Sequence, residues 1–386
     1  MKKAEMQQVF DTVMAQEQKY IDFLCRICSF EARAHDKQTI DSMVDYITEF
    51  AQGEGLSVTR TPMEKCGDFL TIEINEGAEK ACFLHAHMDT VHDKGVFGEI
   101  PVKIDGERIT GPGVIDCKGG ITIGLLCMKS LLDNGFGGHV RMVLTSDEEI
   151  SNILGGEKEI RFIGDSATGF PFAINCETAE RDEVVVARKA ILKYRLDIKG
   201  VSGHSGRHYF TCKNAIEEAA HKIIALHSKS VQGGTTYSCN IISGGTVLNI
   251  IPDQCSMSLD IRALTAQDTE LAKEEVKKVA ETSFVPGTTC EVTLISARPP
   301  MEKSEKTMAL LDDIISVCHK YGLGTLTPTE SGGGSDSCYT QAAGVTSLCG
   351  MGASGGKQHS PNEFLIRSSI ALRAKILAAF MFDRDK

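Results

Sequence analysis

The spacing of hydrophobic and polar residues divides the chain into stretches of different character. Residues 1–55 carry hydrophobic side chains at helical spacing, whereas between about 56 and 188 short hydrophobic runs alternate with helix-like segments such as 119–133. Strands that are hydrophobic on both faces and are separated by helices are typical of a doubly wound sheet. This region therefore predicts an α/β domain with a mostly parallel, twisted sheet flanked by helices.

Residues 191–298 show another pattern. In 191–199 hydrophobic and charged residues alternate, which indicates a half-exposed strand. Helical patterns and further strands follow in the order β-α-β-β-α-β, which is the split βαβ arrangement of a ferredoxin-like α+β unit with its helices on one face of the sheet. We therefore expect a first domain in two pieces, 1–190 and 299–386, interrupted by a second domain at 191–298.

Composition and charge narrow the class of protein. The 386 residues predict two or three domains, and 41 basic against 52 acidic residues give a net charge of −11. An acidic chain is poorly suited to bind nucleic acid or an anionic membrane surface. No apolar run is long enough for a membrane span, no secretory signal is recognisable, and the 14 cysteines show no disulfide-scaffold spacing. These features predict a cytoplasmic protein with reduced thiols.

Five short segments hold most of the unusual polar residues. Each has an ordinary explanation when it is taken alone, because His-x-Asp often marks a hydrogen-bonded structural histidine and acidic triplets are usually solvated turns. The glycine-rich segment lacks a dinucleotide fingerprint, since Asp116 stands where the third glycine would be, and no P-loop lysine is present. The segments are Leu84–Val91, Gly111–Gly120, Thr145–Glu149, Asn175–Glu177 and Gly356–Glu363.

The places of these residues along the chain favour a metal site. Several of them come just after predicted buried strands, at the edge where open α/β sheets bind ligands: His87, Asp89, Glu148, Glu149 and Glu177. Converging carboxylates repel one another and need a counter-charge, and the same loops hold no comparable supply of lysine or arginine. Mixed histidine and carboxylate ligands suit zinc, with cobalt or manganese as substitutes.

The charges favour two metal ions over one. Two zinc ions together with a bridging hydroxide would balance the three carboxylates of Asp116, Glu149 and Glu177, whereas a single ion would leave excess negative charge.

In this order and spacing, the five segments resemble the dinuclear-zinc peptidase and amidohydrolase family that includes aminoacylase, carboxypeptidase G, succinyl-diaminopimelate desuccinylase and peptidase T. The resemblance covers nearly the whole chain, including the inserted domain. It implies a metallopeptidase or amidohydrolase that binds two zinc ions and hydrolyses an amide or peptide bond in a small substrate with a free carboxylate. It also implies that the two-piece domain is catalytic and that residues 191–298 form a lid and dimerisation domain.

The resemblance assigns roles in the catalytic domain. Glu148 resembles the general base, and Asp89 the group that orients the imidazole of His87. Asp116 resembles the carboxylate that bridges both metals, with a cis peptide bond to Cys117. The implied metal ligands are His87, Asp116, Glu149, Glu177 and His359.

The inserted domain carries its own part of the resemblance. Gly203–Ser205 resembles the lid motif in which a histidine, here His204, reaches the site of the partner subunit and stabilises the oxyanion. Asn249 and Arg262 resemble the asparagine and arginine that bind the carboxylate of the substrate. A homodimer formed through the lid domain is therefore expected.

The motifs disagree on the substrate class. Glu177 is typical of deacylases and desuccinylases, whereas His87–Val91, Arg188–Ala190 and Gly332–Asp336 look more like the peptidases. We expect an exopeptidase of the di-/tripeptidase or carboxypeptidase type, with an N-acyl-amino-acid deacylase or desuccinylase as the alternative. A non-catalytic metal-binding or ligand-binding protein on the same fold is the remaining alternative. Glu148 argues against it, because a binding protein needs no general base.

Overall fold

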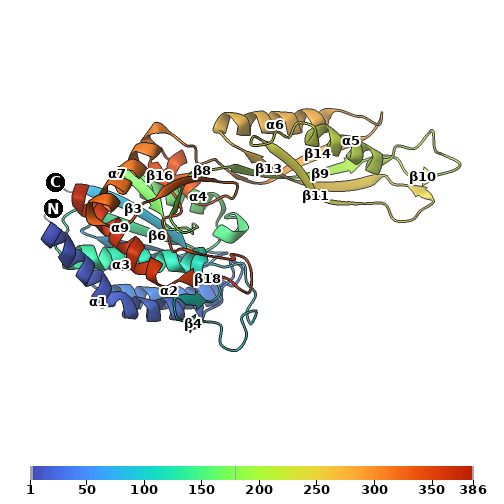
Figure 1. The fold of residues 1–386 in the computed structure, drawn as a ribbon. Coiled ribbons are helices and arrows are strands. Elements are labelled where there is room, and N and C mark those ends of the chain that lie inside the picture. The colour runs from blue at the N-terminus through green and yellow to red at the C-terminus, as the bar shows by residue number, and fades with distance from the viewer. Residues whose placement is uncertain (1–2, 179, 385–386) are drawn as a thin grey trace. The chain divides into compact units, whose positions relative to one another are not determined.

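The computed structural model describes residues 3–178 and 180–384, which form two compact units (Figure 1). Unit 1 consists of Met1–Ala187, Lys303–Glu330 and Ser335–Lys386, and unit 2 of Arg188–Glu302 and Ser331–Gly334. The expected domain limits, at 190/191 and 298/299, stay a prediction.

Unit 1 is built around a six-stranded sheet with the order β1-β2-β6-β3-β7-β16. The four strands from β6 to β16 are parallel, while β1 and β2 are antiparallel additions at one edge. The predicted mostly parallel sheet is thereby confirmed. The strands are β1 (Ser57–Thr61), β2 (Phe69–Ile74), β3 (Lys80–His87), β6 (His139–Thr145), β7 (Phe172–Asn175) and β16 (Thr346–Leu348).

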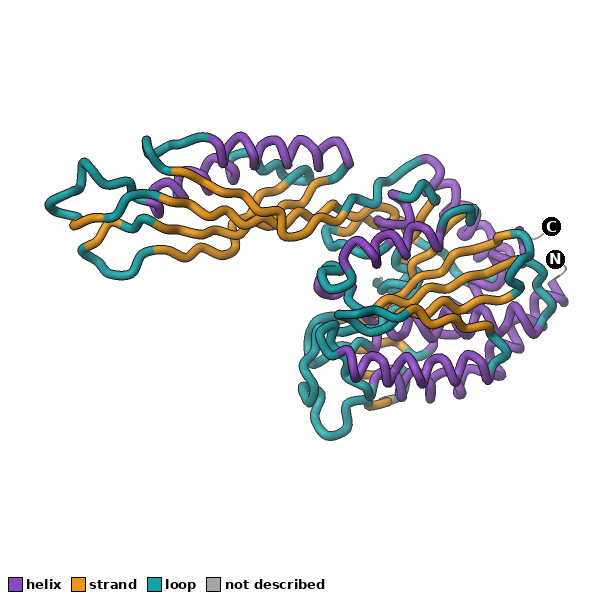
Figure 2. Tube along the Cα trace, turned by 180° about the vertical axis from the view of Figure 1, so that it is seen from behind, coloured by secondary structure: helices purple, strands orange, loops and turns teal. Residues whose placement is uncertain are grey.

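Helices cover both faces of this sheet, as Figures 1 and 2 show from opposite sides. Leu84 of β3 packs into the large core that the helices α1, α3 and α9 complete, whereas its neighbour Phe83 packs on the other face with Ala167 of α4. This alternation follows from the two-residue period of a strand. The helices are α1 (Lys3–Cys28), α2 (Lys37–Gly53), α3 (Gly119–Asp133), α4 (Gly156–Ala167), α7 (Glu305–Tyr321), α8 (Ser337–Ala342) and α9 (Ser368–Arg384).

Short strands and turns complete unit 1. A four-stranded sheet pairs β17 (Gly355–Gly356), β18 (Phe364–Ile366), β5 (Arg108–Thr110) and β4 (Lys103–Asp105), and β8 (Glu183–Arg188) pairs with β15 (Thr327–Ser331). Two helical turns, η1 (Val114–Lys118) and η2 (Glu148–Ile150), follow at loops that the sequence marks as polar.

Unit 2 is an antiparallel four-stranded sheet with the order β11-β13-β9-β14 and two helices packed against it. In β9 the exposed and buried positions alternate toward its end, as the sequence predicts. The predicted α+β arrangement is confirmed. Its elements are β9 (Ala190–Lys199), β10 (Gly203–His204), α5 (Ala215–His227), β11 (Thr236–Gly244), β12 (Ile250–Ile251), β13 (Gln254–Ala263), α6 (Ala266–Glu281) and β14 (Thr289–Arg298).

All 14 cysteines are free thiols. Among the described residues, no helix has both the length and the apolar composition that a membrane crossing requires.

Candidate metal centre

Three parallel strands bring the polar segments of unit 1 together. In the register of the sheet, His87 at the end of β3 lies opposite Thr145 at the end of β6, and His85 lies opposite Asn175 at the end of β7. The residues that follow β6 and β7 in sequence, including Glu148 and Glu177, therefore leave the sheet at the same edge. Figure 2 shows loops gathered at this edge of the sheet.

His87 lies at the centre of the cluster with its ring buried. Its Nδ1 is 3.2 Å from Asp89 Oδ1, while its Nε2 is 3.2 Å from Asp116 Oδ1 and 3.4 Å from Glu177 Oε1. One ring nitrogen thus faces the carboxylate expected to orient it, and the other faces two carboxylates expected to bind metal.

Asp116 connects the two histidines of the cluster. Its Oδ1 faces His87, while its Oδ2 is 3.4 Å from His359 Nε2, which is also 3.3 Å from Glu149 Oε2. A carboxylate whose two oxygens point toward different ligand groups has the arrangement that a bridge between two ions requires.

The loop that holds Asp116 is fixed by a residue to which the sequence analysis gave no role. Glu363 Oε1 accepts hydrogen bonds from the backbone N–H groups of Ile115 and Asp116, at 3.1 and 3.2 Å. Its Oε2 is 2.8 Å from His92 Nε2. The Asp116–Cys117 peptide bond is cis, as the resemblance implied. The position of Glu363 four residues after His359 was the signal that could have pointed to it.

Asp89 also fixes the turn η2. Its Oδ1 and Oδ2 accept hydrogen bonds from the backbone N–H groups of Glu148 and Glu149, at 3.3 and 3.1 Å. The same carboxylate therefore orients the imidazole of His87 and the backbone that presents the expected general base. Glu148 itself keeps 9% of its surface exposed.

The carboxylates of the cluster shift the pKa values of the groups around them. Burial and the neighbouring carboxylate of Asp116 raise the pKa of Glu149 to about 8 and also raise the pKa of Glu177. Burial alone would lower the pKa of His87, but the carboxylates around it outweigh burial and raise it. Hydrogen bonds to Asp116 and Glu149 raise the pKa of His359 to about 11. The side chains by themselves thus hold protons that a cation would displace.

The donor set fits divalent metal ions. Ligand atoms of His87, Asp116 and Glu149 lie within 4.8 Å of one another, as do those of His87, Cys117 and Glu177. The Oε1 atom of Glu149 is buried and has no hydrogen-bond partner in the part of the chain that the structure describes. Histidine nitrogens and carboxylate oxygens with an unsatisfied buried acceptor are what a zinc-type site provides. Cys117 was not among the metal ligands expected from the sequence.

The residues predicted in unit 2 occupy two places. His204 and Asn249 lie close together on the exposed β10–β12 pair, where Ser205 N donates to Asn249 O at 3.0 Å. Arg262 lies on β13, where its guanidinium pairs with Asp260, Nε to Oδ1, at 2.6 Å and donates to Gly332 O at 3.2 Å. Arg262 is thus oriented by Asp260 and the glycine loop.

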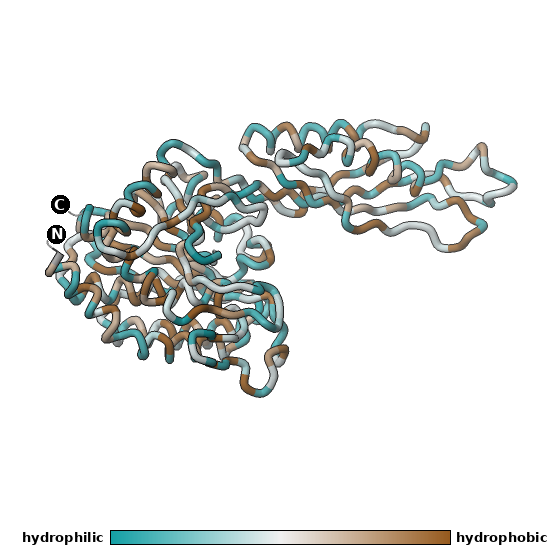
Figure 3. Tube along the Cα trace, viewed as in Figure 1, coloured by the Kyte–Doolittle hydropathy of each residue, from teal (hydrophilic) through white to brown (hydrophobic). Residues whose placement is uncertain are grey.

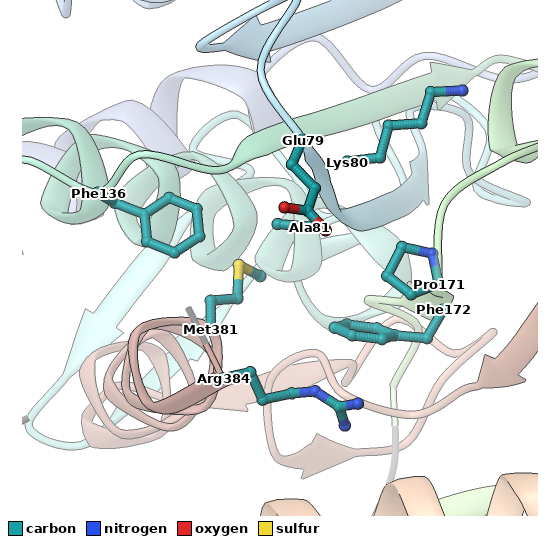
Figure 4. Close-up of a pocket in the computed structure, with 8 residues that line it drawn as sticks. All are labelled: Glu79, Lys80, Ala81, Phe136, Pro171, Phe172, Met381 and Arg384. Carbon is teal, nitrogen blue, oxygen red and sulfur yellow. The ribbon is translucent and has the colours of Figure 1, made fainter. Parts of the chain in front are cut away.

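A pocket of about 330 Å³ lies in unit 1 near the amino ends of β3 and β7 (Figure 4). Its eight lining residues include three charged ones, Glu79, Lys80 and Arg384, but no histidine or cysteine. This lining offers no set of metal ligands.

Comparisons with known proteins agree with this geometry. The family described as Peptidase family M20/M25/M40 matches residues 83–383. Carboxypeptidase G2 of Pseudomonas sp. (strain RS-16) is 24% identical over 97% of this chain and 91% of its own length. Succinyl-diaminopimelate desuccinylase of Sulfurovum sp. (strain NBC37-1) is 26% identical over 93% of this chain and 96% of its own length.

Solved structures show the same fold. A tripeptidase from Staphylococcus aureus superimposes with a TM-score of 0.80 at 22% identity and covers 96% of this chain and 98% of its own. Solved members of the family include a protein described as a dinuclear metal binding peptidase. The family match includes the loops of the candidate metal centre and the inserted unit, and the chain is a member of the M20/M25/M40 family of metal-dependent hydrolases.

Proposed function

We propose that this protein is a zinc-dependent exopeptidase that removes a residue from small peptides with a free carboxylate. The observation that carries the proposal is the position of Glu148 in a turn fixed by Asp89, next to a cluster of metal ligands. The peptidase-like segments His87–Val91, Arg188–Ala190 and Gly332–Asp336 support the peptidase class, as does the similarity to a carboxypeptidase.

The proposed metal ligands are the five residues expected from the sequence. His87 and Glu177 would hold one ion, His359 and Glu149 the other, and Asp116 would bridge them. When bound, the metal ions polarise the scissile carbonyl and make a water molecule acidic enough to lose a proton near neutral pH. Zinc suits this donor set, and cobalt or manganese could replace it.

The side chains of the protein supply the proton transfers. Glu148 takes the proton from the attacking water and later delivers it to the leaving nitrogen, a role typically worth about 10²–10⁴-fold in rate. Asp89 keeps His87 in one orientation and holds the backbone of Glu148 in place.

In this proposal, unit 2 recognises the substrate. Arg262, oriented by Asp260, would bind the carboxylate of the substrate, and the Asn249 that joins it would come from a second copy of the chain, because Asn249 lies beside His204. His204 would stabilise the oxyanion in the site of a second copy of the chain. We therefore expect Arg262→Ala to raise KM more than it lowers kcat, and His204→Ala to lower kcat.

Exposed hydrophobic residues on unit 2 support a homodimer. The edge strand β11 exposes Ile241 and Ile242, and the neighbouring loop exposes Leu248 completely. Exposed apolar side chains on an edge strand favour pairing with another chain. Mixing inactive Glu148→Ala with inactive His204→Ala protein should restore part of the activity, because a mixed dimer would contain one intact site. The absence of recovery would contradict a role of His204 across the dimer.

The alternative function is that of an N-acyl-amino-acid deacylase or desuccinylase. Glu177 is the residue that favours it, as does the similarity to a desuccinylase. The two functions differ in the group on the acyl side of the bond that is cleaved.

A substrate panel separates the two functions. The protein, loaded with zinc, cobalt or manganese, is assayed on di- and tripeptides and on N-acetyl and N-succinyl amino acids, with Glu148→Ala as the blank. We expect the highest kcat/KM on a peptide. Hydrolysis confined to N-acyl amino acids would overturn the exopeptidase proposal, and no hydrolysis of any substrate would overturn both functions.

A further inference from the structure

A second group of possible metal ligands lies beside the loop that carries Glu148 and Glu149. Cys66 comes from the connection between β1 and β2, Asp147 from the segment before η2, and Glu159 from α4. The thiol and one carboxylate oxygen of each acid lie within 4.8 Å of one another. The relative exposure of all three residues is 0%.

The acceptor atoms of this group are largely unsatisfied. Both carboxylate oxygens of Glu159 and the Oδ1 atom of Asp147 are buried without a hydrogen-bond partner among the described residues. Only Asp147 Oδ2 is satisfied, by the backbone N–H groups of Leu154 and Gly155 at 2.9 Å each. The Glu159 carboxylate packs so closely against Gly155 that a side chain there would clash with it. Glu159 is therefore held with its carboxylate facing into the group.

A lysine near this group already forms ion pairs with other carboxylates. Burial and the neighbouring Asp147 raise the pKa of the Cys66 thiol to about 11, and Lys37 only partly offsets them. The ammonium group of Lys37 is 2.6 Å from Asp68 Oδ1 and 2.9 Å from Asp41 Oδ2. Burying carboxylates without a counter-charge is strongly unfavourable, so the group must take up either a proton or a cation.

A single proton would satisfy fewer of these buried acceptor atoms than a cation would. Burial and the neighbouring Asp147 raise the pKa of Glu159, so a proton shared by these two acids is the competing state. That proton could satisfy one oxygen of Glu159 and Oδ1 of Asp147, but it would leave the second oxygen of Glu159 without a partner and give Cys66 no part. A cation can contact both carboxylates and the sulfur at once.

We propose that Cys66, Asp147 and Glu159 bind a divalent metal ion at a site separate from the cluster around His87. Zinc is the ion that best fits a thiolate beside two carboxylates, because calcium and magnesium prefer ligands that are all oxygen. The ion would join three segments of unit 1 and hold the loop between Asp147 and Gly155, which includes Glu148 and Glu149. The site is structural and does not depend on which bond the enzyme cleaves.

Cobalt reports directly on the thiolate. The full-length protein is freed of metal by chelation and titrated with Co²⁺, and sulfur ligation is read from the thiolate-to-cobalt charge-transfer absorption in the near ultraviolet. Cys117 lies within ligand distance of His87 and Glu177, so the titration is done in the Cys117→Ser variant. Among the described residues, the remaining possible metal group with a cysteine is the proposed one. We expect the absorption in Cys117→Ser and its loss when Cys66→Ser is added, whereas its absence from Cys117→Ser would overturn the proposal.

Metal counting gives a second test that does not need Cys66 to be changed. We expect zinc-loaded Glu159→Gln to contain one equivalent of zinc less per chain than the wild-type protein, by elemental analysis after gel filtration. Glu157→Gln is the matched control, because Glu157 lies on the same helix with its side chain 89% exposed, and it should keep the full zinc content. Equal zinc content in Glu159→Gln and the wild type would overturn the proposal. Neither measurement uses turnover, so failure of the exopeptidase proposal would leave both results interpretable.

Discussion

The two units bury their sheets differently. Helices cover both faces of the sheet in unit 1, whereas in unit 2 the helices α5 and α6 pack with the sheet in a single core. Of the 23 large hydrophobic residues that are exposed among those described, 17 lie in unit 2, which holds less than a third of the chain. Figure 3 shows hydrophobic stretches along its edge strand β11. Unit 1 thus completes its apolar core by itself, whereas unit 2 keeps apolar surface available for another molecule.

The two units also differ in the partners of their buried charged side chains. In unit 2 the buried Lys222 lies 2.8 Å from Glu218 Oε1 and donates to the carbonyls of Val279, Ala280 and Thr282. In unit 1 the carboxylate of Glu149 keeps an unsatisfied buried oxygen. Buried charged groups therefore occur in both units, and the convergence of several carboxylates with a histidine is what distinguishes the candidate metal centre.

The largest expected effect tests whether the chemistry belongs to unit 1. Replacing Glu148 by alanine should lower kcat by about 10²–10⁴-fold, because it removes the general base. The metal content measured by elemental analysis should stay at the wild-type value, since Glu148 is not among the proposed ligands. Glu157→Ala, an exposed change in the same unit, is the control for kcat. A wild-type kcat in the Glu148→Ala enzyme would contradict the proposed mechanism.

Metal removal should separate the stabilities of the two units. Ions that bind only the folded state stabilise it by about 4 kcal/mol when their concentration is 1,000 times Kd. We expect calorimetry of the full-length protein to show that chelation lowers the Tm of unit 1 and leaves the transition of unit 2 in place. A chelation effect confined to unit 2 would contradict the assignment of the metal cluster.

A charged residue on the exposed surface of unit 2 should change assembly but not folding. Leu248→Asp should shift the protein toward the monomer in sedimentation velocity, because it places a carboxylate in the proposed apolar interface. Exposed substitutions usually change stability by less than about 0.5 kcal/mol, so Tm should hardly move. Ile104→Asp, at a position of unit 1 that is 47% exposed, is the matched control and should leave the sedimentation coefficient unchanged.

The smallest effect concerns an ion-pair network in unit 1. Burial opposes ionisation of Asp68, but Lys37, the Met63 N–H and Arg60 outweigh burial and lower its pKa. A lowered folded-state pKa contributes stability that is present above the unfolded-state pKa and is lost as pH falls through the folded-state value. Asp68→Asn should therefore lower the free energy of unfolding by about 1–3 kcal/mol at pH 7 and by less at acid pH, as urea titrations would measure. An equal loss at both pH values would contradict this origin.

Local patterns in the sequence predicted most of the fold. The helix expected at 119–133 is α3, Gly119–Asp133, and the alternation in 191–199 belongs to β9, Ala190–Lys199. Both depend on the periodicity of adjacent residues. The pairing of β2 between β1 and β6 was not predicted, because strand order depends on contacts between distant parts of the chain.

The same limit applies to the site. The sequence predicted that His87, Glu149 and Glu177 lie at one edge of the sheet, because each of them follows a recognisable strand. It did not reveal the hydrogen bonds from Glu363 to the backbone of Asp116, nor the group formed by Cys66 and Glu159. Those side chains meet only through the packing of segments that no local pattern connects.

The division of unit 1 into three sequence pieces has a consequence for protein synthesis. During translation β7 emerges long before its parallel partner β16, and His359 emerges after the whole of unit 2. Domains fold most readily when their residues are contiguous, so a nascent chain must hold an incomplete sheet with an unpaired edge until its final segment is made. The proposed hydrolase can therefore become active only after the segment that follows unit 2, which contains His359, has been synthesised.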